Sequence, residues 1–177
     1  MLNLNDSASR IIKEALIYFQ GEKIEALVFI LPIGLISLVF CAWLLTDDGS
    51  AYAKGLAIPF LVMGLLMTTV GAVVGYRTPG QISQLEKALK SSPETADAAL
   101  INEQQRMIKV NRAWNHYLVI WALMGVLGLL LRFVARGEFM QGLGIGLVFF
   151  CGVGLIVDGF AERRTHPYSE VLNIRKL

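Results

Sequence analysis

The chain has 177 residues, of which 55% are hydrophobic and only 17% carry a charge, and its mean hydropathy is +0.56. Soluble domains average about 25% charged residues, so this composition excludes an ordinary soluble protein. The length is that of one domain, and a net charge of +2 says little about partners.

Four stretches contain no Asp, Glu, Lys or Arg, and they have 21, 22, 19 and 19 residues: 26–46, 55–76, 113–131 and 139–157. A hydrocarbon core about 30 Å thick needs about 20 apolar residues in a helix that rises about 1.5 Å per residue. Each stretch is long enough to cross a bilayer once. The sequence predicts an all-α integral membrane protein of a single domain, 1–177, with four transmembrane helices in two hairpins.

The segment before the first span has the pattern of an amphipathic helix over 7–20. Asp6 or Ser7 can cap its start, and Gly21 follows its end. Five apolar residues recur at helical spacing, while charged residues fall between them: Ile11, Ile12, Ala15, Leu16 and Phe19. We expect this helix to lie at the membrane surface before the first span begins at residue 26 and runs to 46.

After the second span, 55–76, the sequence Arg77-Thr78-Pro79-Gly80 predicts a break. A cytoplasmic helical hairpin is expected over 81–112. Ser92 is the predicted cap of its second helix, with Pro93 at the first helical position and Glu94 in the first turn, where the helix dipole favours an anion. No helix breaker lies between 95 and 114, so this helix should continue into the third span, 113–135. The fourth span follows at 139–160, and a cytoplasmic tail at 161–177.

The basic residues are distributed unevenly between the two sides of the predicted membrane. Thirteen of the 16 Lys and Arg lie before the first span, in 77–112 or in the tail, and only Lys54, Arg132 and Arg136 lie in the other two connections. The positive-inside rule therefore places both termini and the long middle segment in the cytoplasm. The expected location is the bacterial inner membrane. Segment 77–112 has six basic and four acidic residues without interleaved aromatic residues, so no nucleic-acid partner is expected.

Small residues form a stripe along the second span. On a helical wheel, five of them project within about 40° of one another: Ala57, Gly64, Thr68, Gly71 and Gly75. Gly71 and Gly75 make a GxxxG motif, which lets two helix backbones approach closely in lipid. A shorter stripe on the first span consists of Gly34, Ser37 and Cys41. We expect spans 1 and 2 to pack through these stripes, with an intersubunit contact as the alternative.

The fourth span carries glycines that share no single face: Gly142, Gly144, Gly146, Gly152 and Gly154. A helix of this kind can be approached from several sides or can be locally soft, and composition does not choose between the two. Gly142 and Gly146 are the candidates for helix packing or partner binding. A phosphate-binding glycine loop is excluded, because the run follows no strand.

Polar groups are sparse inside the spans. Arg132 and Asp158 fall near the predicted interfaces; Arg132 is expected to anchor its helix by reaching toward the head groups, and Asp158 to pair with Arg163 or a helix end. An anion-attracting arginine and a gating carboxylate are the functional alternatives. His116 belongs by position to an interfacial aromatic belt. The two cysteines lie in different spans without a CxxC motif, so no catalytic, metal or cofactor site is predicted.

In length, span number and inside termini, the chain resembles the immunity proteins that protect bacteria against membrane-inserting, pore-forming toxins. This resemblance concerns architecture and implies a protein that binds another membrane protein. The predicted function is therefore non-enzymatic binding through helix contacts with a membrane-protein partner or with further copies of the chain. The alternative is an oligomeric channel or an uncoupled facilitator for a small solute, and a membrane enzyme is the third class considered.

Overall fold

A computed structural model describes residues 4–46 and 49–174 of the chain. Its elements are all helical: α1 (Leu4–Glu25), η1 (Ala26–Ile30), α2 (Leu31–Thr46), α3 (Ala51–Leu89), α4 (Pro93–Phe133) and α5 (Glu138–Val171). Four helical runs are long and apolar enough to cross a membrane, and each contains one of the four uncharged windows. The all-α class and the four candidate spans are thereby confirmed.

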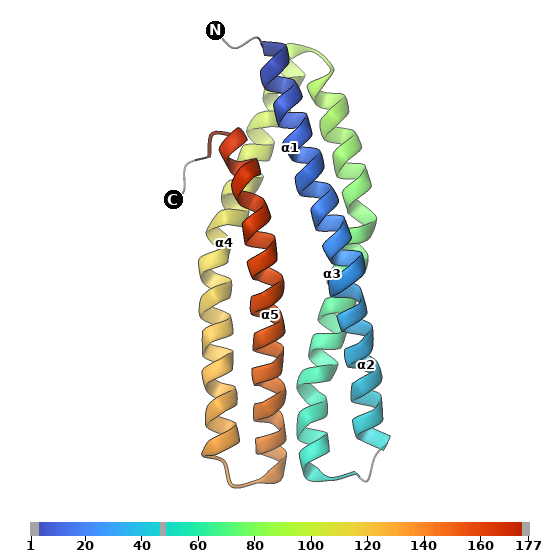
Figure 1. The fold of residues 1–177 in the computed structure, drawn as a ribbon, viewed down its shortest axis with the longest axis vertical. Coiled ribbons are helices and arrows are strands. Elements are labelled where there is room, and N and C mark those ends of the chain that lie inside the picture. Colours follow the sequence, from blue (N-terminus) through green and yellow to red (C-terminus); the bar gives the residue numbers. More distant parts are fainter. Residues whose placement is uncertain (1–3, 47–48, 175–177) are drawn as a thin grey trace.

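The first three elements form one continuous helical run, and the predicted end at Gly21 is wrong. The glycine is used for close packing instead, since a Cβ there would lie 2.7 Å from Cδ of Arg164 on α5. Because α1 continues the line of α2 (Figure 1), it is no separate surface helix. A π-helical turn joins the two, in which the Leu31 N–H bonds to the Ala26 carbonyl. The expected cap at Asp6 or Ser7 lies outside the residues with described side chains.

The predicted break at Pro79 is also wrong, because α3 runs through Pro59 and Pro79 to Leu89. A proline inside a helix costs about 3 kcal/mol or more. Tertiary packing offsets this cost: Thr78 is fully buried and donates to the Val74 carbonyl at 2.7 Å, and beyond the proline Ile82 packs against a buried aromatic cluster. The helix that contains the second uncharged window therefore continues well beyond residue 76.

The start of α4 agrees with the sequence prediction. The Ser92 hydroxyl accepts the backbone N–H of Thr95 at 3.4 Å, Pro93 opens the helix, and Glu94 lies in its first turn. The helix continues without a break to Phe133. Segment 81–112 thus consists of the ends of α3 and α4, rather than of two separate helices.

The predicted tail is helical over most of its length, since α5 continues to Val171. Four of its described residues are buried: Thr165, Tyr168, Ser169 and Leu172. Packing of this segment against α1 and α4 explains why the helix does not end with the fourth span.

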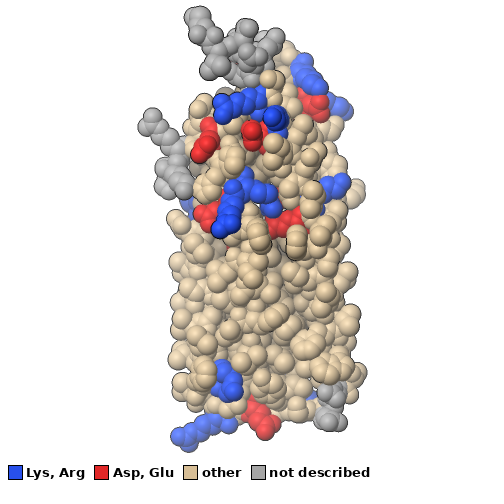
Figure 2. Space-filling view, in the orientation of Figure 1, with Lys and Arg blue, Asp and Glu red and all other residues tan. Residues whose placement is uncertain are grey.

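The helices α4, α5, α3 and α2 lie side by side in that order over the lower half of Figure 1. The pairs α2 with α3, α3 with α5, and α5 with α4 carry most of the tertiary contacts. The start of α1 and the end of α5 lie at the same end as the turn between α3 and α4. We call this the charged end (residues 4–25, 77–112 and 160–174) and the four uncharged windows the apolar region. On the face in Figure 2, charged side chains gather toward both ends and leave a wide uncharged belt between them.

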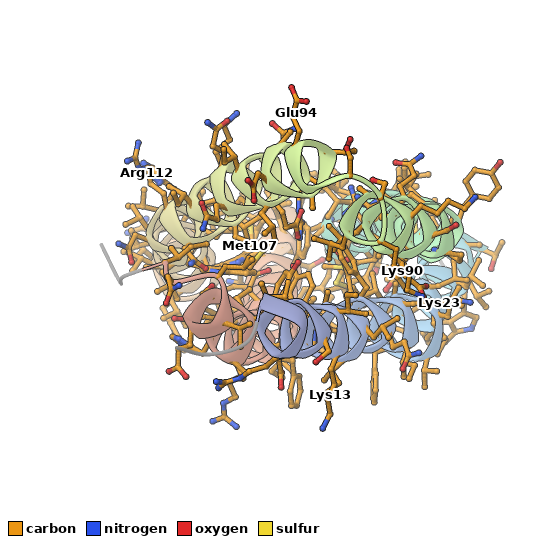
Figure 3. All side chains as sticks on the ribbon, turned by 90° about the horizontal axis from the view of Figure 1, so that it is seen from above. Lys13, Lys23, Lys90, Glu94, Met107 and Arg112 are labelled. Carbon is orange, nitrogen blue, oxygen red and sulfur yellow. The ribbon has the colours of Figure 1, made fainter. Side chains whose placement is uncertain are left out.

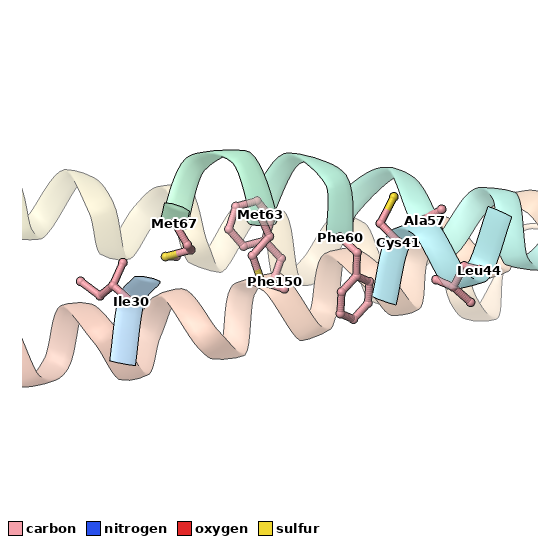
Figure 4. Packing of buried hydrophobic residues seen from close by; sticks show 8 residues of the cluster. All are labelled: Ile30, Cys41, Leu44, Ala57, Phe60, Met63, Met67 and Phe150. Atoms are coloured by element: carbon pink, nitrogen blue, oxygen red, sulfur yellow. The ribbon is translucent and has the colours of Figure 1, made fainter. Parts of the chain in front are cut away.

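Two buried clusters correspond to these two regions. In the apolar region, residues from η1, α2, α3 and α5 form the first (Figure 4): Ile30, Cys41, Leu44, Ala57, Phe60, Met63, Met67 and Phe150. At the charged end, residues from α1, α4 and the end of α5 form the second: Ala15, Tyr18, Phe19, Met107, Tyr168 and Leu172.

Candidate functional site

The small-residue stripe of α3 faces α2 and η1. A Cβ on Gly71 would lie 2.8 Å from the backbone nitrogen of Leu31, and one on Gly75 would lie 2.6 Å from a methyl group of Leu27. A Cβ on Gly64 would lie 2.7 Å from the Leu38 side chain. The stripe is therefore occupied by the same chain and leaves no room there for a partner helix.

The remaining members of both stripes belong to the same contact. Thr68 faces Gly34, where a Cβ would overlap the Thr68 backbone, and Ala57 is 2% exposed. On α2, Ser37 is buried and donates to the Ile33 carbonyl at 2.6 Å, so its hydroxyl is satisfied inside its own helix. Cys41 is a buried free thiol.

The glycines of α5 divide between two neighbours, which explains their spread around the wheel. Gly142 and Gly146 face α3: a Cβ would lie 3.0 Å from the Leu56 nitrogen at Gly142 and 2.7 Å from the Pro59 ring at Gly146. Gly144 faces α4, and a Cβ added there would lie 2.7 Å from the backbone nitrogen of Arg132. Because α5 lies between α3 and α4, it needs small residues on two faces.

Other glycines complete these crossings from the opposite side, and sequence reasoning missed them. Gly55 of α3 lies against the Phe139 backbone, and Gly128 of α4 lies against Gly144 and Val148. Gly55 belongs to the second window, and Gly125 and Gly128 belong to the third. Their one sequence signal is a small residue inside a span, which does not reveal the neighbour. Gly152, by contrast, has open space where a Cβ would be.

The two interfacial charges lie on different helices and do not form one site. Asp158 accepts a hydrogen bond from the Trp121 indole of α4 at 2.5 Å, so the predicted pairing with Arg163 or a helix end is wrong. Residues 37 positions apart meet because α4 and α5 pack together. Arg132 lies over the ring of the adjacent Phe133, 5.6 Å from its centroid, near the end of α4.

The charged end holds an aromatic core. Tyr18 of α1 stacks on Tyr168 of α5 with ring centroids 5.1 Å apart, and Phe19 meets the same tyrosine edge-on at 6.3 Å. Met107 of α4 is fully buried and points inward, whereas Lys13, Glu94 and Arg112 extend outward (Figure 3). Three helices are thus joined by large side chains at this end.

A partly buried ionic network lies beside this core. The Arg106 guanidinium donates to both carboxylate oxygens of Glu103, at 2.9 and 2.7 Å, and the Tyr168 hydroxyl donates to Glu103 at 2.9 Å. Burial opposes the charge on Arg106, but the hydrogen bond and charge of Glu103 outweigh it and raise the pKa of the guanidinium. Burial, followed by the charge of Glu103, raises the pKa of Tyr168, so its phenol stays a neutral donor.

Two further ion pairs hold α1 where the charged end meets the apolar region. Arg77 of α3 pairs with Glu22 at 3.1 Å, and Arg164 of α5 pairs with Glu25. Each ion pair joins two residues that are more than 50 positions apart in the sequence. The α1 helix is therefore fixed to α3 on one side and to α5 on the other.

Among the described residues, neither histidine belongs to a group of three or more His, Cys, Asp or Glu side chains that could hold a metal ion. Nδ1 of His116 lies 3.1 Å from the Arg112 carbonyl of its own helix. His166 lines a polar groove of about 670 Å³ between α4 and α5, in which Asn111 donates to Ser169 at 3.0 Å.

No protein-family model matches the chain, and no curated protein and no solved structure matches it either.

Proposed function

We propose that this chain is a multi-pass protein of the bacterial inner membrane that binds another membrane protein through helix contacts and catalyses no reaction. Its four spans form two membrane hairpins, with the charged end in the cytoplasm, as the excess of Lys and Arg at that end favours. The most concrete version is an immunity protein against a membrane-inserting, pore-forming toxin.

The observation that carries the proposal is the exposure of α4. Only 6% of its apolar window is buried against the rest of the chain, compared with 39% for α3 and 28% for each of the other two spans. The small-residue stripe of α3, in contrast, is filled by α2. The window of α4 is thus the least buried of the four, and its outward side remains available to a partner helix.

This outward side is a continuous face of branched apolar side chains. Four residues spaced at i, i+4, i+7 and i+11 are 53% to 66% exposed: Val119, Leu123, Val126 and Leu130. They lie opposite the side of α4 that packs on α5 through Trp121, Gly125 and Gly128. In lipid, such a face binds another helix by van der Waals packing when the shapes fit.

The test is to express the chain beside the toxin-like gene nearest to its own and to measure membrane potential and viability. The double variant Leu123→Trp with Leu130→Trp changes the shape of the α4 face. Its matched control is Ile36→Trp with Val39→Trp, on exposed positions of α2. We expect the wild type and the control to protect, and the α4 variant to lose protection at an equal level of membrane protein.

Equal protection by the α4 variant and the control would remove the α4 face from the proposal. Failure of the wild type to protect, together with solute flux through the purified chain in liposomes, would support the channel instead. Loss of protection in an alanine variant of His116, His166, Arg132 or Asp158 at normal protein level would indicate a chemical site and contradict the binding role.

A further inference from the structure

A lateral groove of about 500 Å³ runs between α1 and α5 at the border of the charged end. Its walls are mostly apolar and come from Ile17, Ile24 and Phe29 on one side and Phe160 on the other. The charged residues that line it are Glu14, Glu25, Arg163 and Arg164. The groove therefore combines a long apolar wall with charged groups.

The groove crosses the boundary between the two regions of the molecule. Phe29 lies inside the first uncharged window, whereas Glu25 immediately precedes that window. On α5, the fourth window ends at residue 157, and Phe160 and Arg163 follow it. Figure 2 shows the corresponding border, where basic and acidic side chains adjoin the uncharged belt on the face that carries α1 and α5. In a bilayer, this level is that of the lipid head groups.

Glu25 is an unusual lining residue, because it is deeply buried and incompletely hydrogen-bonded. Its side chain is 8% exposed; one carboxylate oxygen pairs with Arg164, while the other, Oε1, is buried without a hydrogen-bond partner. Burial raises the pKa of Glu25 despite the nearby Arg164. A buried carboxylate oxygen without a donor is costly, so a ligand that brings a donor would gain from this position.

Arg163 supplies the opposite charge. It lines the groove and is exposed, and among the residues that the structure describes it belongs to none of the ion pairs. The groove thus offers an available cation and an unsatisfied anionic acceptor on one side of the apolar boundary. A ligand that complements it carries a negative group, a hydrogen-bond-donating cation and a hydrocarbon chain.

We propose that the groove binds one phospholipid with a primary ammonium head group, of the phosphatidylethanolamine type. Its ammonium donates to Oε1 of Glu25, its phosphate contacts Arg163, and an acyl chain lies along Ile24, Phe29 and Phe160. Phosphatidylcholine fits less well because its methylated ammonium has no N–H. Phosphatidylglycerol fits less well because it brings a net negative charge and no cation to a carboxylate.

The inference shares with the proposed function only the insertion of the chain in a membrane, and its test needs no partner protein. The full chain, purified in detergent, is titrated with phosphatidylethanolamine, phosphatidylcholine and phosphatidylglycerol of identical acyl chains, and bound lipid is counted by native mass spectrometry. We expect phosphatidylethanolamine to bind about tenfold more tightly than the other two, the size of effect typical of one charge-assisted hydrogen bond.

Glu25→Gln should abolish the preference for the primary ammonium, and its matched control is Glu22→Gln. Glu22 lies one turn away on α1 and pairs with Arg77, but it does not line the groove. Arg163→Gln should weaken the binding of phosphatidylethanolamine and of phosphatidylcholine to the same extent, since both lipids carry the phosphate. The wild-type comparison of lipids stands even if a variant fails to fold.

Equal binding of the three lipids by the wild type would overturn the proposal, as would a preference for phosphatidylglycerol. An undiminished ammonium preference in a folded Glu25→Gln variant would have the same consequence. None of these outcomes affects the proposed role of the α4 face, which is measured by toxin protection.

Discussion

The apolar region and the charged end are built from the same long helices but are packed by opposite means. In the apolar region, glycines bring backbones together: Gly71 lies on Leu31, and Gly142 lies on α3. At the charged end, stacked tyrosines and the pair of Glu103 with Arg106 fill the space between helices. In lipid, burial of apolar side chains gains little, so close contact and van der Waals attraction hold helices together. In water, large buried aromatic side chains supply the stabilisation.

The largest effect is expected from Glu103→Ala at the charged end. This change leaves the Arg106 guanidinium and the Tyr168 hydroxyl without their shared acceptor in a largely buried position. Loss of a buried partner of this kind costs about 3 kcal/mol of unfolding free energy. Thermal unfolding of the purified protein in detergent measures the effect.

The control for that variant is Glu86→Ala, which removes the exposed pair of Glu86 with Lys90. Exposed pairs contribute at most about 1 kcal/mol, so the control should unfold close to the wild type. Similar unfolding temperatures for both alanine variants would mean that the ionic network does not hold the charged end together.

Gly142→Ala should give the next largest effect and tests the apolar region. The new Cβ would overlap the Tyr52 carbonyl and lie 3.0 Å from the Leu56 nitrogen. Because backbone atoms cannot move aside as a flexible side chain does, we expect a loss of about 2 kcal/mol. The readout is again the unfolding temperature in detergent.

Gly152→Ala on the same helix is the matched control, since nothing lies within 4 Å of the added atom. Alanine favours a helix over glycine by about 1 kcal/mol, so this variant should be unchanged or slightly stabilised. Opposite signs for the two substitutions are the expected result; two losses of equal size would argue against close backbone packing between α5 and α3.

Comparison of the two regions also shows which features the sequence encodes locally. The uncharged windows and the Ser92–Pro93 helix start were predictable, because hydropathy and capping depend on neighbours in the chain. Gly21 and Pro79 were misinterpreted as breaks because their effect depends on Arg164 and on the packing beyond Thr78, which are contacts between helices. The same reason explains why Trp121 could not be identified as the partner of Asp158.

The packing site was partly accessible to sequence reasoning. Helical periodicity alone places the small residues of the α3 stripe on one face of the helix. The division of the α5 glycines between α3 and α4 requires the order of the helices in space. The groove beside Glu25 could not be predicted, because its lining comes from residues about 140 positions apart.

Among the three test variants, Tyr168→Phe should give the smallest loss of stability, and it adds a dependence on pH. Near neutral pH, loss of the hydrogen bond to Glu103 should cost about 1 to 2 kcal/mol. Burial and the charge of Glu103 raise the pKa of this phenol above its usual value of 10.0. The folded state therefore keeps the proton more firmly than the unfolded state, and this stability is present below about pH 10 and is lost at higher pH.

The measurement is the difference in unfolding free energy between the wild type and Tyr168→Phe across the alkaline range. That difference should shrink as the pH rises above about 10, because the phenylalanine cannot titrate. A difference that stays constant or grows would show that the Tyr168 hydroxyl is not held as a neutral donor.

In the proposed topology, the apolar region crosses the membrane and the charged end lies in the cytoplasm. Single cysteines at Ser91, in the turn between α3 and α4, and at Ser50, before α3, test it most directly with a membrane-impermeant thiol reagent. Cys41 and Cys151 are only 4% and 8% exposed, and the unsubstituted chain controls for their reaction. In intact cells, we expect labelling at Ser50→Cys and protection of Ser91→Cys until the membrane is opened. Labelling of Ser91→Cys in intact cells would contradict it.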